Sequence, residues 1–360
     1  MLLVCLVLGF SLRNGLAPPR VSLGASTCGI VAQLPPMAVE VTGLPQIRLA
    51  SPSADSEKPI LLYLPGIDLS GYTVQPQVER LSADFEVRAL SVPTADRSTF
   101  GELLDLVVGE IHAAGRPVYI AGESFGGVLA LRVATEGSSP PKNLRGLVLV
   151  NPATSAGRAW PAALFPLFDA VSSLPSGLSD ATYEALLVPI LGVIAVNPLR
   201  MGARDEDKGL PPPLRDAAAI IRMSQNLPNL LELPKALPLP NLALRLRQLV
   251  DEAEALDAAT LRRLKLPVQL LASSDDKILP SSDECRRLAR LMPAAQLTPL
   301  EGSGHAPLLE AEVDLASLIR SSGVLSRTAP PPQDWVGGFV PPSPEAIANA
   351  TESLSGIRKV

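Results

Sequence analysis

The chain has 360 residues, of which 47% are hydrophobic and 19% charged, and its net charge is −5 at pH 7. This length suits one large domain or two domains of roughly 150 residues, and the apolar content excludes an intrinsically disordered chain. Acidic charge is a poor match for a phosphate backbone, so no nucleic-acid partner is expected. Three cysteines without a CxxC pair indicate neither a disulfide framework nor a zinc site, and no metal or cofactor is expected.

Residues 1–45 are predicted to form a targeting segment. The apolar stretch 2–10 is shorter than the roughly 20 residues that cross a bilayer. Basic and hydroxyl-bearing residues follow it, and no acidic residue occurs before Glu40. This pattern is typical of a signal core followed by a transit-like stretch, and it favours a plastid location. An apolar leader without any address is the alternative.

Strands and helices alternate in the next part of the chain. The run from Ile60 to Leu64 is continuously apolar and ends in Pro-Gly, as expected of a strand buried on both faces. The same reasoning predicts further strands at 86–92, 117–121 and 146–150, and helices at 74–83, 100–114 and 125–135. Such alternation predicts an α/β fold with a mostly parallel central sheet flanked by helices.

The alternation stops at Asn151. Residues 152–265 have helical periodicity broken by prolines, which predicts an inserted helical cap. Alternation then resumes, with predicted strands at 268–272 and 296–300 and predicted helices at 282–291 and 308–319. We therefore expect one domain over residues 46–326, followed by a proline-rich linker or tail over residues 327–360.

The chemistry is expected where the strand at 117–121 meets its helix. Residues 122–127 read Gly-Glu-Ser-Phe-Gly-Gly, a G-x-S-x-G pattern that directly follows a strand and directly precedes a helix. Ser124 is the candidate nucleophile, and glycines at Gly122 and Gly126 are expected to let the sharp turn pack. A glycine-rich turn with an incidental serine is the alternative.

A serine nucleophile needs a base, which this kind of fold supplies late in the chain, in the order serine, acid, histidine. His305 lies in a small-residue loop after a predicted strand and fits that position, whereas His112 lies within a predicted helix and is expected to be structural or exposed. Asp276 lies four residues before the proline that opens the next helix and is the predicted acid, with Asp275 as the alternative. Its role is to orient the imidazole and to stabilise its charged form.

Two backbone amides are expected to stabilise the negative charge that develops on the substrate oxygen. One is the N–H of Phe125, next to the nucleophile. The other is the N–H of Ile67, in the loop after the first buried strand. An ordinary glycine turn is the alternative for that loop.

With Ser124, Asp276 and His305 in this order, the sequence resembles the α/β-hydrolase superfamily. More narrowly, over roughly residues 58–345, it is similar to the plastid esterase, lipase and thioesterase group that includes the phytyl ester synthases. The phrases that carry this resemblance are 64–68 (LPGID), 86–88 (EVR), 122–127 (GESFGG), 151–155 (NPATS), 279–281 (LPS) and 339–344 (FVPPSP). The sequence departs from the group's pattern at Leu69, where the group has glycine, and no HxxxxD motif of a second acyltransferase domain follows.

The resemblance implies a fatty-acyl donor, which is acyl-CoA, acyl carrier protein or a lipid. It also implies an acceptor that is water or an alcohol such as phytol or diacylglycerol, with contact to a thylakoid or plastoglobule surface. The apolar stretch 186–196 of the cap is interpreted as a lid that lines an acyl channel, with plain packing on the sheet as the alternative. Two alternative functions remain open: a non-catalytic binder of a small apolar ligand, and a small-molecule esterase or haloperoxidase-like hydrolase.

Overall fold

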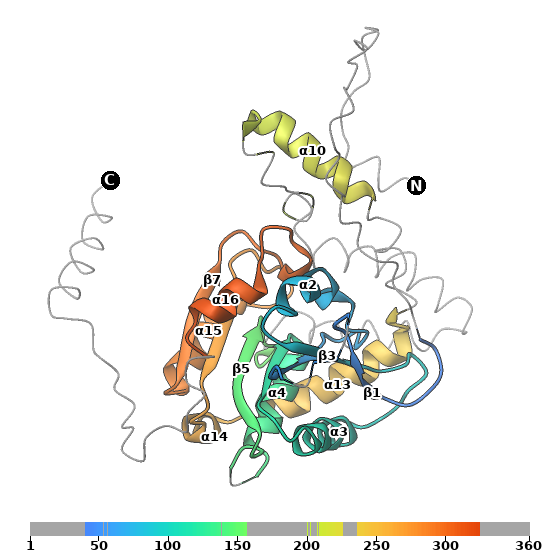
Figure 1. Cartoon of the computed structure of the whole chain (residues 1–360), viewed down its shortest axis with the longest axis vertical. Coiled ribbons are helices and arrows are strands. Elements are labelled where there is room, and N and C mark those ends of the chain that lie inside the picture. The colour runs from blue at the N-terminus through green and yellow to red at the C-terminus, as the bar shows by residue number, and fades with distance from the viewer. Residues whose placement is uncertain are drawn as a thin grey trace, which may run out of the picture. The chain divides into compact units, whose positions relative to one another are not determined.

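The computed structural model describes most of the middle of the chain (Figure 1). The described residues are 40–52, 54–55, 57–137, 139–156, 200, 202, 207, 209–225 and 236–324. Within these ranges, seven strands form one sheet in the order β1-β3-β2-β4-β5-β6-β7. β1 pairs with β3 in the antiparallel sense, and all other neighbours pair in parallel. The chain therefore has the α/β architecture expected from the alternating pattern.

The strands of the sheet match the apolar runs of the sequence. They are β1 (Gln46–Leu49), β2 (Ile60–Leu64), β3 (Glu86–Ser91), β4 (Val118–Glu123), β5 (Leu144–Val150), β6 (Val268–Ser273) and β7 (Ala295–Leu300). β2, β4 and β6 are buried along their whole length, because helices cover both faces of the sheet. Alternate residues of β2 point to opposite faces, so Leu62 packs in one hydrophobic core and Leu61 in the other.

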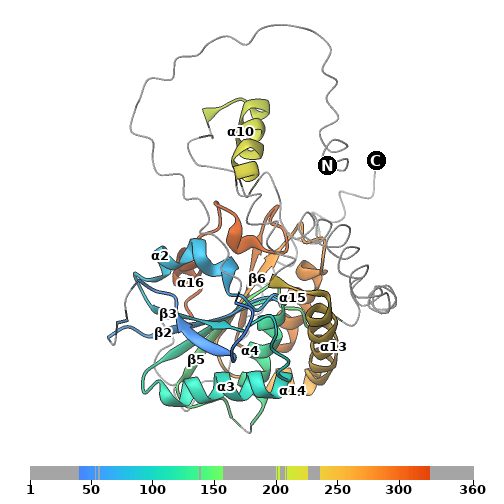
Figure 2. The same ribbon diagram turned by 90° about the vertical axis from the view of Figure 1, so that its right-hand side faces the viewer.

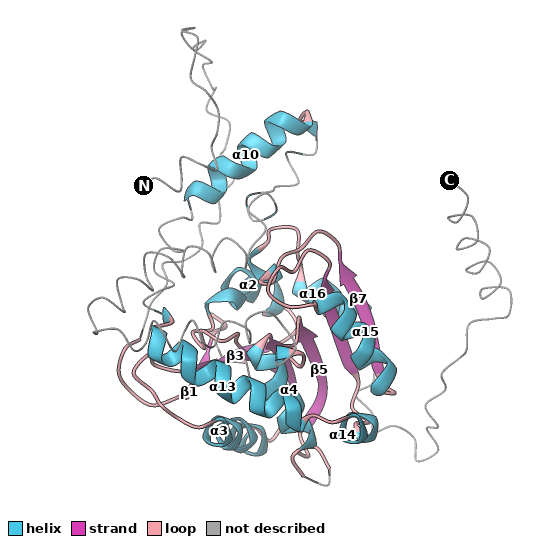
Figure 3. Cartoon of the chain, turned by 180° about the vertical axis from the view of Figure 1, so that it is seen from behind, coloured by secondary structure: helices cyan, strands magenta, loops and turns pink. Residues whose placement is uncertain are grey.

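The helices divide between the two faces of the sheet (Figures 2 and 3). One core contains residues of α3 (Phe100–Ala113), α4 (Phe125–Thr135), α13 (Leu239–Ala255), α14 (Ala258–Arg263) and α15 (Ser281–Leu291). The other contains residues of η1 (Tyr72–Gln77), α2 (Val78–Leu81), η5 (Pro307–Leu309) and α16 (Leu315–Ser321). α10 (Pro212–Gln225) belongs to neither of these two cores.

The structure differs from the sequence-based expectations in three elements. β1 was not expected, because its four residues are mostly exposed and carry no continuous apolar run. The helix expected at 74–83 is a 3₁₀ turn followed by the short α2, since Pro76 interrupts the helical hydrogen bonds. The closing helix expected at 308–319 is split into η5 and α16.

The segment between β5 and β6 connects two neighbouring strands of the sheet. β5 and β6 are neighbours, with Leu147 opposite Val268, although more than 100 residues separate them in the chain. The described parts of this segment include the helices α10, α13 and α14. α13 returns the chain to the body, where it packs against α4 and places Glu252 against Arg132. The stretch 186–196 lies outside the described residues.

Because β2 and β4 to β7 run parallel, the loops after them all emerge at one edge of the sheet, which we call the carboxyl edge. In open α/β sheets this is the edge at which ligands bind. The opposite side, where these strands begin, is called the amino edge.

Candidate active site

Ser124 lies in the turn between β4 and α4, at the carboxyl edge. Its backbone has φ 51° and ψ −110°, a conformation that an L-residue with a side chain rarely adopts. Such a residue stores strain of order 1–3 kcal/mol, which the surrounding packing must hold. The sharp turn leaves the Ser124 side chain at the first turn of α4, where backbone N–H groups lack acceptors within the helix.

Gly122 and Gly126 allow this turn to pack tightly. A Cβ atom on Gly122 would lie 2.4 Å from the Gly126 carbonyl oxygen, and one on Gly126 would lie 1.9 Å from the carbonyl oxygen of Leu64. Both distances are far inside van der Waals contact with backbone atoms, which cannot swing away. A larger residue at Gly126 would therefore push α4 away from β2, and one at Gly122 would push α4 away from β4.

His305 connects Ser124 to Asp276. The Ser124 hydroxyl lies 3.0 Å from His305 Nε2, and His305 Nδ1 lies 2.8 Å from Asp276 Oδ2. Ser124 follows β4, Asp276 follows β6 and His305 follows β7, so three distant parts of the sequence meet at the carboxyl edge. The order of serine, acid and histidine is the order expected from the sequence.

Asp276 is held in place by more than the imidazole. Its Oδ1 accepts the backbone N–H groups of Ile278 and Leu279 at 2.8 and 3.0 Å, and Ser281 donates its hydroxyl to Oδ2. Burial alone raises the pKa of Asp276, but the charge and hydrogen bond of His305 outweigh it, and the net pKa lies below the usual range. The neighbouring Asp275 is half exposed and pairs with Lys277 instead.

The same pairing acts on the base. Burial alone lowers the pKa of His305, but the Asp276 carboxylate and its hydrogen bond outweigh that, so the net pKa is raised. Holding Nδ1–H on the carboxylate leaves Nε2 free to accept a proton from Ser124. His112, by contrast, is exposed in the last turn of α3.

Asn151 fixes the loop that carries His305. It is fully buried at the end of β5, has a positive φ of 45°, and donates its side-chain amide to the His305 carbonyl at 2.9 Å. Its amide oxygen accepts the N–H of Ser273 at 2.8 Å, which joins the ends of β5 and β6. On the other side of the loop, Gly304 N–H donates to the buried Glu310 carboxylate at 2.8 Å, and Arg200 pairs with Glu310.

The two residues expected to supply amide donors lie in separate segments beside Ser124. Phe125 is the first residue of α4 and follows Ser124 directly. Ile67 lies in the loop after β2, which passes beside the serine: a Cβ on Gly66 would lie 3.9 Å from Ser124 Cβ. We call residues 65–72 the oxyanion loop. Leu69, where the resembled group has glycine, adopts a positive φ of 52°.

Two acidic residues of this edge were not assigned a role from the sequence. Glu123 precedes the nucleophile and is 2% exposed, and Asp68 lies in the oxyanion loop. Burial raises the pKa of both carboxyl groups, against the hydrogen bonds that they accept. A polar residue at the end of an otherwise apolar strand is the sequence signal that identifies both Glu123 and Asn151.

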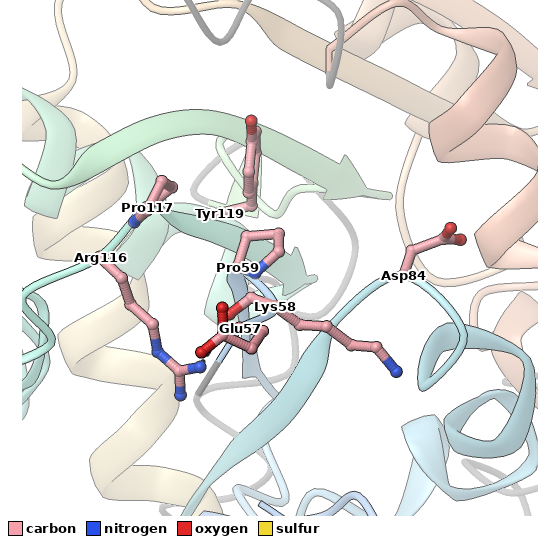
Figure 4. A pocket seen from close by; sticks show the side chains of 7 residues that line it. All are labelled: Glu57, Lys58, Pro59, Asp84, Arg116, Pro117 and Tyr119. Atoms are coloured by element: carbon pink, nitrogen blue, oxygen red, sulfur yellow. Dashed lines mark hydrogen bonds between the residues drawn. The ribbon is translucent and has the colours of Figure 1, made fainter. Parts of the chain in front are cut away.

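A cavity of about 370 Å³ lies at the amino edge, away from these residues (Figure 4). Its lining includes Lys58 and Pro59 before β2, Arg116 and Pro117 before β4, and Asp84 before β3. These positions are at the opposite ends of the strands from Ser124. The cavity is therefore separate from the candidate active site.

Among the described residues, no cluster of three histidine, cysteine or acidic side chains has the geometry of a metal site. Nor does any helix in the described ranges have the length and apolar character needed to cross a bilayer.

The model of the alpha/beta hydrolase family matches residues 61–318. Phytyl ester synthase 1, chloroplastic, of Arabidopsis thaliana is 31% identical over 306 residues, which are 83% of this chain and 42% of that protein. A second chloroplastic phytyl ester synthase of that plant is 30% identical, with 38% of its length covered. The chain thus spans about two fifths of the length of these two relatives.

A pimeloyl-(acyl-carrier protein) methyl ester esterase of Xanthomonas oryzae is 28% identical over 258 residues, which are 70% of this chain and 89% of that enzyme. Among solved structures, the enol-lactonase of Burkholderia xenovorans superposes with a TM-score of 0.52 at 14% identity, covering 78% of this chain and 95% of the lactonase. At that identity the match supports the fold alone.

Proposed function

The chain belongs to the alpha/beta hydrolase family, and on that premise we propose that it is a serine-dependent acyl-ester hydrolase or acyltransferase acting on lipid esters. The observation that carries this proposal is the hydrogen-bonded series Ser124, His305 and Asp276. The esterase and ester synthase relatives support an ester substrate.

In the proposed first step, Ser124 Oγ attacks the carbonyl carbon of the acyl donor while His305 Nε2 takes the hydroxyl proton. Asp276 holds Nδ1–H and stabilises the imidazolium that forms. The negative charge on the former carbonyl oxygen is stabilised by the N–H groups of Phe125 and Ile67. His305 then gives its proton to the leaving group, an alcohol from an ester or a thiol from a thioester, and an acyl-Ser124 ester remains.

In the second step, an acceptor O–H loses its proton to His305 and attacks the acyl-Ser124 carbonyl. Ser124 is released with the proton that His305 returns. Water as acceptor gives a free fatty acid, whereas an alcohol such as phytol or diacylglycerol gives a new ester. Both outcomes use the same three residues, so the acceptor site decides between them.

We propose a fatty-acyl donor, namely acyl-CoA, acyl carrier protein or a lipid ester, because ester-forming and acyl-carrier-protein esterase relatives both resemble the chain. Residues 152–265 are proposed as a cap that selects the acyl chain at the surface of a membrane. The chloroplastic relatives support a plastid location, with residues 1–45 as the targeting segment and 327–360 as a linker or tail.

The test is fluorophosphonate labelling of the full chain, with the modified peptide mapped by mass spectrometry and Ser124→Ala as the control. We expect one label, on Ser124, and near-complete loss of ester cleavage in the variant with an unchanged fold. Acyl transfer to phytol is then compared with release to water across a series of acyl-chain lengths. A folded protein that takes no label, or a variant that keeps most of its activity, would contradict the proposal. A preference for short methyl esters would favour the small-substrate esterase alternative.

A further inference from the structure

Glu123 lies directly before the nucleophile, and the mechanism above gives it no role. Its side chain is 2% exposed, at the last position of β4. A buried carboxyl group is costly unless it is paired or hydrogen-bonded, so its partners determine what it does. No described lysine or arginine pairs with it, and all of its hydrogen-bond partners are hydroxyl groups.

The partners of Glu123 lie on either side of the oxyanion loop. Tyr63, in β2 just before the loop, places its hydroxyl against Glu123 Oε2. Thr73, in η1 just after the loop, places its hydroxyl 2.6 Å from the same oxygen. One carboxyl oxygen beside the nucleophile therefore holds both ends of the segment that carries the Ile67 N–H. The position of that donor relative to Ser124 depends on this contact.

The three oxygens form a closed cycle that requires a third proton. The Tyr63 and Thr73 hydroxyls are also within 2.5 Å of each other, so each of the three oxygens contacts the other two. Each contact needs one proton between its oxygens, and the two hydroxyl groups supply only two. The third is supplied if Glu123 carries a proton on Oε2.

The other oxygen of Glu123 supports the same conclusion. Oε1 is buried and has no hydrogen-bond partner in the described part of the chain. In an ionised carboxylate it would carry about half of an unpaired buried charge, whereas in a neutral acid it is a carbonyl oxygen, which costs far less to bury. Burial raises the pKa of this group and outweighs the Thr73 and Tyr63 hydrogen bonds and the charge of His305, which lower it; the nearby Asp68 carboxyl adds a smaller effect in the same direction as burial.

We propose that Glu123 is a positioning residue that works as a neutral carboxylic acid, locking the oxyanion loop to the nucleophile turn through Tyr63 and Thr73. The inference rests on the proposed function, since it assigns a role within that site. The neutral state also matters electrostatically. An anion beside the nucleophile would oppose the negative charge that develops on the substrate oxygen.

The titratable groups around Glu123 are Tyr63 on β2, Asp68 in the oxyanion loop and His305 after β7. His305 must lose its proton to act as base, so its titration controls the acid limb of the pH profile. Glu123 must keep its proton, so kcat falls again as pH rises through its raised pKa. Tyr63 is deeply buried next to a carboxyl group and has a pKa well above its usual range, so it keeps its proton longer.

The experiment compares two substitutions in the full chain. Glu123→Gln keeps the shape and the neutral state, so we expect kcat within about threefold of wild type at neutral pH and no alkaline decline linked to this group. Glu123→Ala removes the anchor, and kcat should drop about 10- to 100-fold at every pH with KM little changed, because one oxyanion donor is displaced. Glu86→Gln is the matched control, since Glu86 is equally buried but lies at the amino edge.

Two results would overturn the inference. One is a loss of more than about tenfold for Glu123→Gln at neutral pH, which would mean that the carboxylate charge is needed. The other is full kcat in Glu123→Ala. Tyr63→Phe and Thr73→Val should each cause part of the fall in kcat that we expect for Glu123→Ala. Neither should lower kcat further when combined with Glu123→Ala.

An infrared measurement separates this inference from the proposed function. A neutral Glu123 contributes the carbonyl band of a protonated carboxylic acid at neutral pH, and the band disappears in Glu123→Gln. Absence of the band from the folded wild-type protein contradicts the neutral state even if the chain hydrolyses no ester. Its presence in a chain that fluorophosphonate does not label contradicts the proposed function and leaves the protonation supported.

Discussion

Glu86 and Glu123 are two glutamates of the same sheet with nearly equal burial, and their environments are opposite. Glu86 begins β3 at the amino edge, is 1% exposed, and receives hydrogen bonds from Arg88 and Arg116, both at 2.6 Å. Burial alone raises the pKa of Glu86, but the two guanidinium groups outweigh it and hold the pKa at about 2. Glu123 ends β4 at the carboxyl edge, contacts only hydroxyl groups, and has a raised pKa.

This difference shows that burial does not fix the charge of a carboxyl group; its partners do. At the amino edge the buried acid is neutralised by cations and serves the fold. At the carboxyl edge, no described lysine or arginine pairs with Glu123 or Asp68, and both residues lie next to Ser124 or in the loop beside it. The three non-glycine residues with positive φ in the described part of the chain, Leu69, Ser124 and Asn151, also lie at the carboxyl edge. Backbone strain and these two acids with raised pKa therefore occur at the same edge, as expected for a functional site.

The largest expected effect is that of Asp276→Asn. The amide cannot hold the imidazole in the tautomer that leaves Nε2 free, so kcat for ester hydrolysis should fall about 10³- to 10⁴-fold with the fold retained. Steady-state hydrolysis of a chromogenic fatty-acyl ester measures this loss. Asp275→Asn is the matched control, because Asp275 pairs with Lys277 at the surface and should change kcat little. Equal losses in both variants would contradict the assignment of Asp276.

Gly126→Ala should have the next largest effect. The added methyl would lie 1.9 Å from the Leu64 carbonyl oxygen, so the turn must open, and we expect a loss of roughly 3 kcal/mol or more in unfolding free energy. Urea unfolding gives that value. The control is Gly109→Ala on the exposed side of α3, where the added Cβ would meet no neighbouring atom within 4 Å. That change should instead stabilise the protein by about 0.5–1 kcal/mol. Similar unfolding free energies for the two variants would contradict the tight packing of Gly126 against Leu64.

Glu86→Gln should give the smallest effect. We expect a loss of about 1–3 kcal/mol in the free energy of unfolding at neutral pH, with the pH profile of activity unchanged. Because the pKa of Glu86 is lowered from 4.5 to about 2, its stabilising contribution is full above pH 4.5 and is lost as pH falls toward 2. Glu123, with its raised pKa, should show the reverse dependence, with stability lost as pH rises through that pKa. Chemical unfolding of the wild type and of both glutamine variants at a series of pH values checks both pH dependences. The same direction of pH dependence for Glu86 and Glu123 would contradict the contrast between them.

The sheet and the meeting of Ser124, His305 and Asp276 could be predicted because local signals agreed with the final packing. The run 60–64 forms β2 and the helix expected at 125–135 forms α4, since each is strongly apolar and bounded by glycine or proline. The contact of Ser124 with His305 was predictable because strand order and loop position bring the carboxyl ends of parallel strands together. The exposed β1 could not be predicted, since its pairing depends on β3 rather than on its own sequence.

The role proposed for Glu123 could not be predicted either, for a physical reason. Its protonation depends on the hydroxyls of Tyr63 and Thr73, which lie 60 and 50 residues away in the chain. The local sequence indicates that a polar residue ends a buried strand, but it does not indicate which atoms that residue will contact. The charge state of a buried acid is therefore a tertiary property.

The segment between β5 and β6 leaves the sheet and returns beside it at the same edge, so its length and sequence can change without moving the strands. Ala156 follows β5 at the carboxyl edge, and Ala236 and Leu237 return beside Ile67 and Thr94 at that same edge. Both junctions lie there, and β5 pairs directly with β6 across the insertion. Since loop-closure entropy changes slowly with length, the intervening stretch can be resized at small cost to the sheet, provided that Arg200, which pairs with Glu310 beside the His305 loop, is kept. Chimeras joined at these two points should acquire new substrates while retaining the same nucleophile, which makes the chain a versatile template for evolution and engineering.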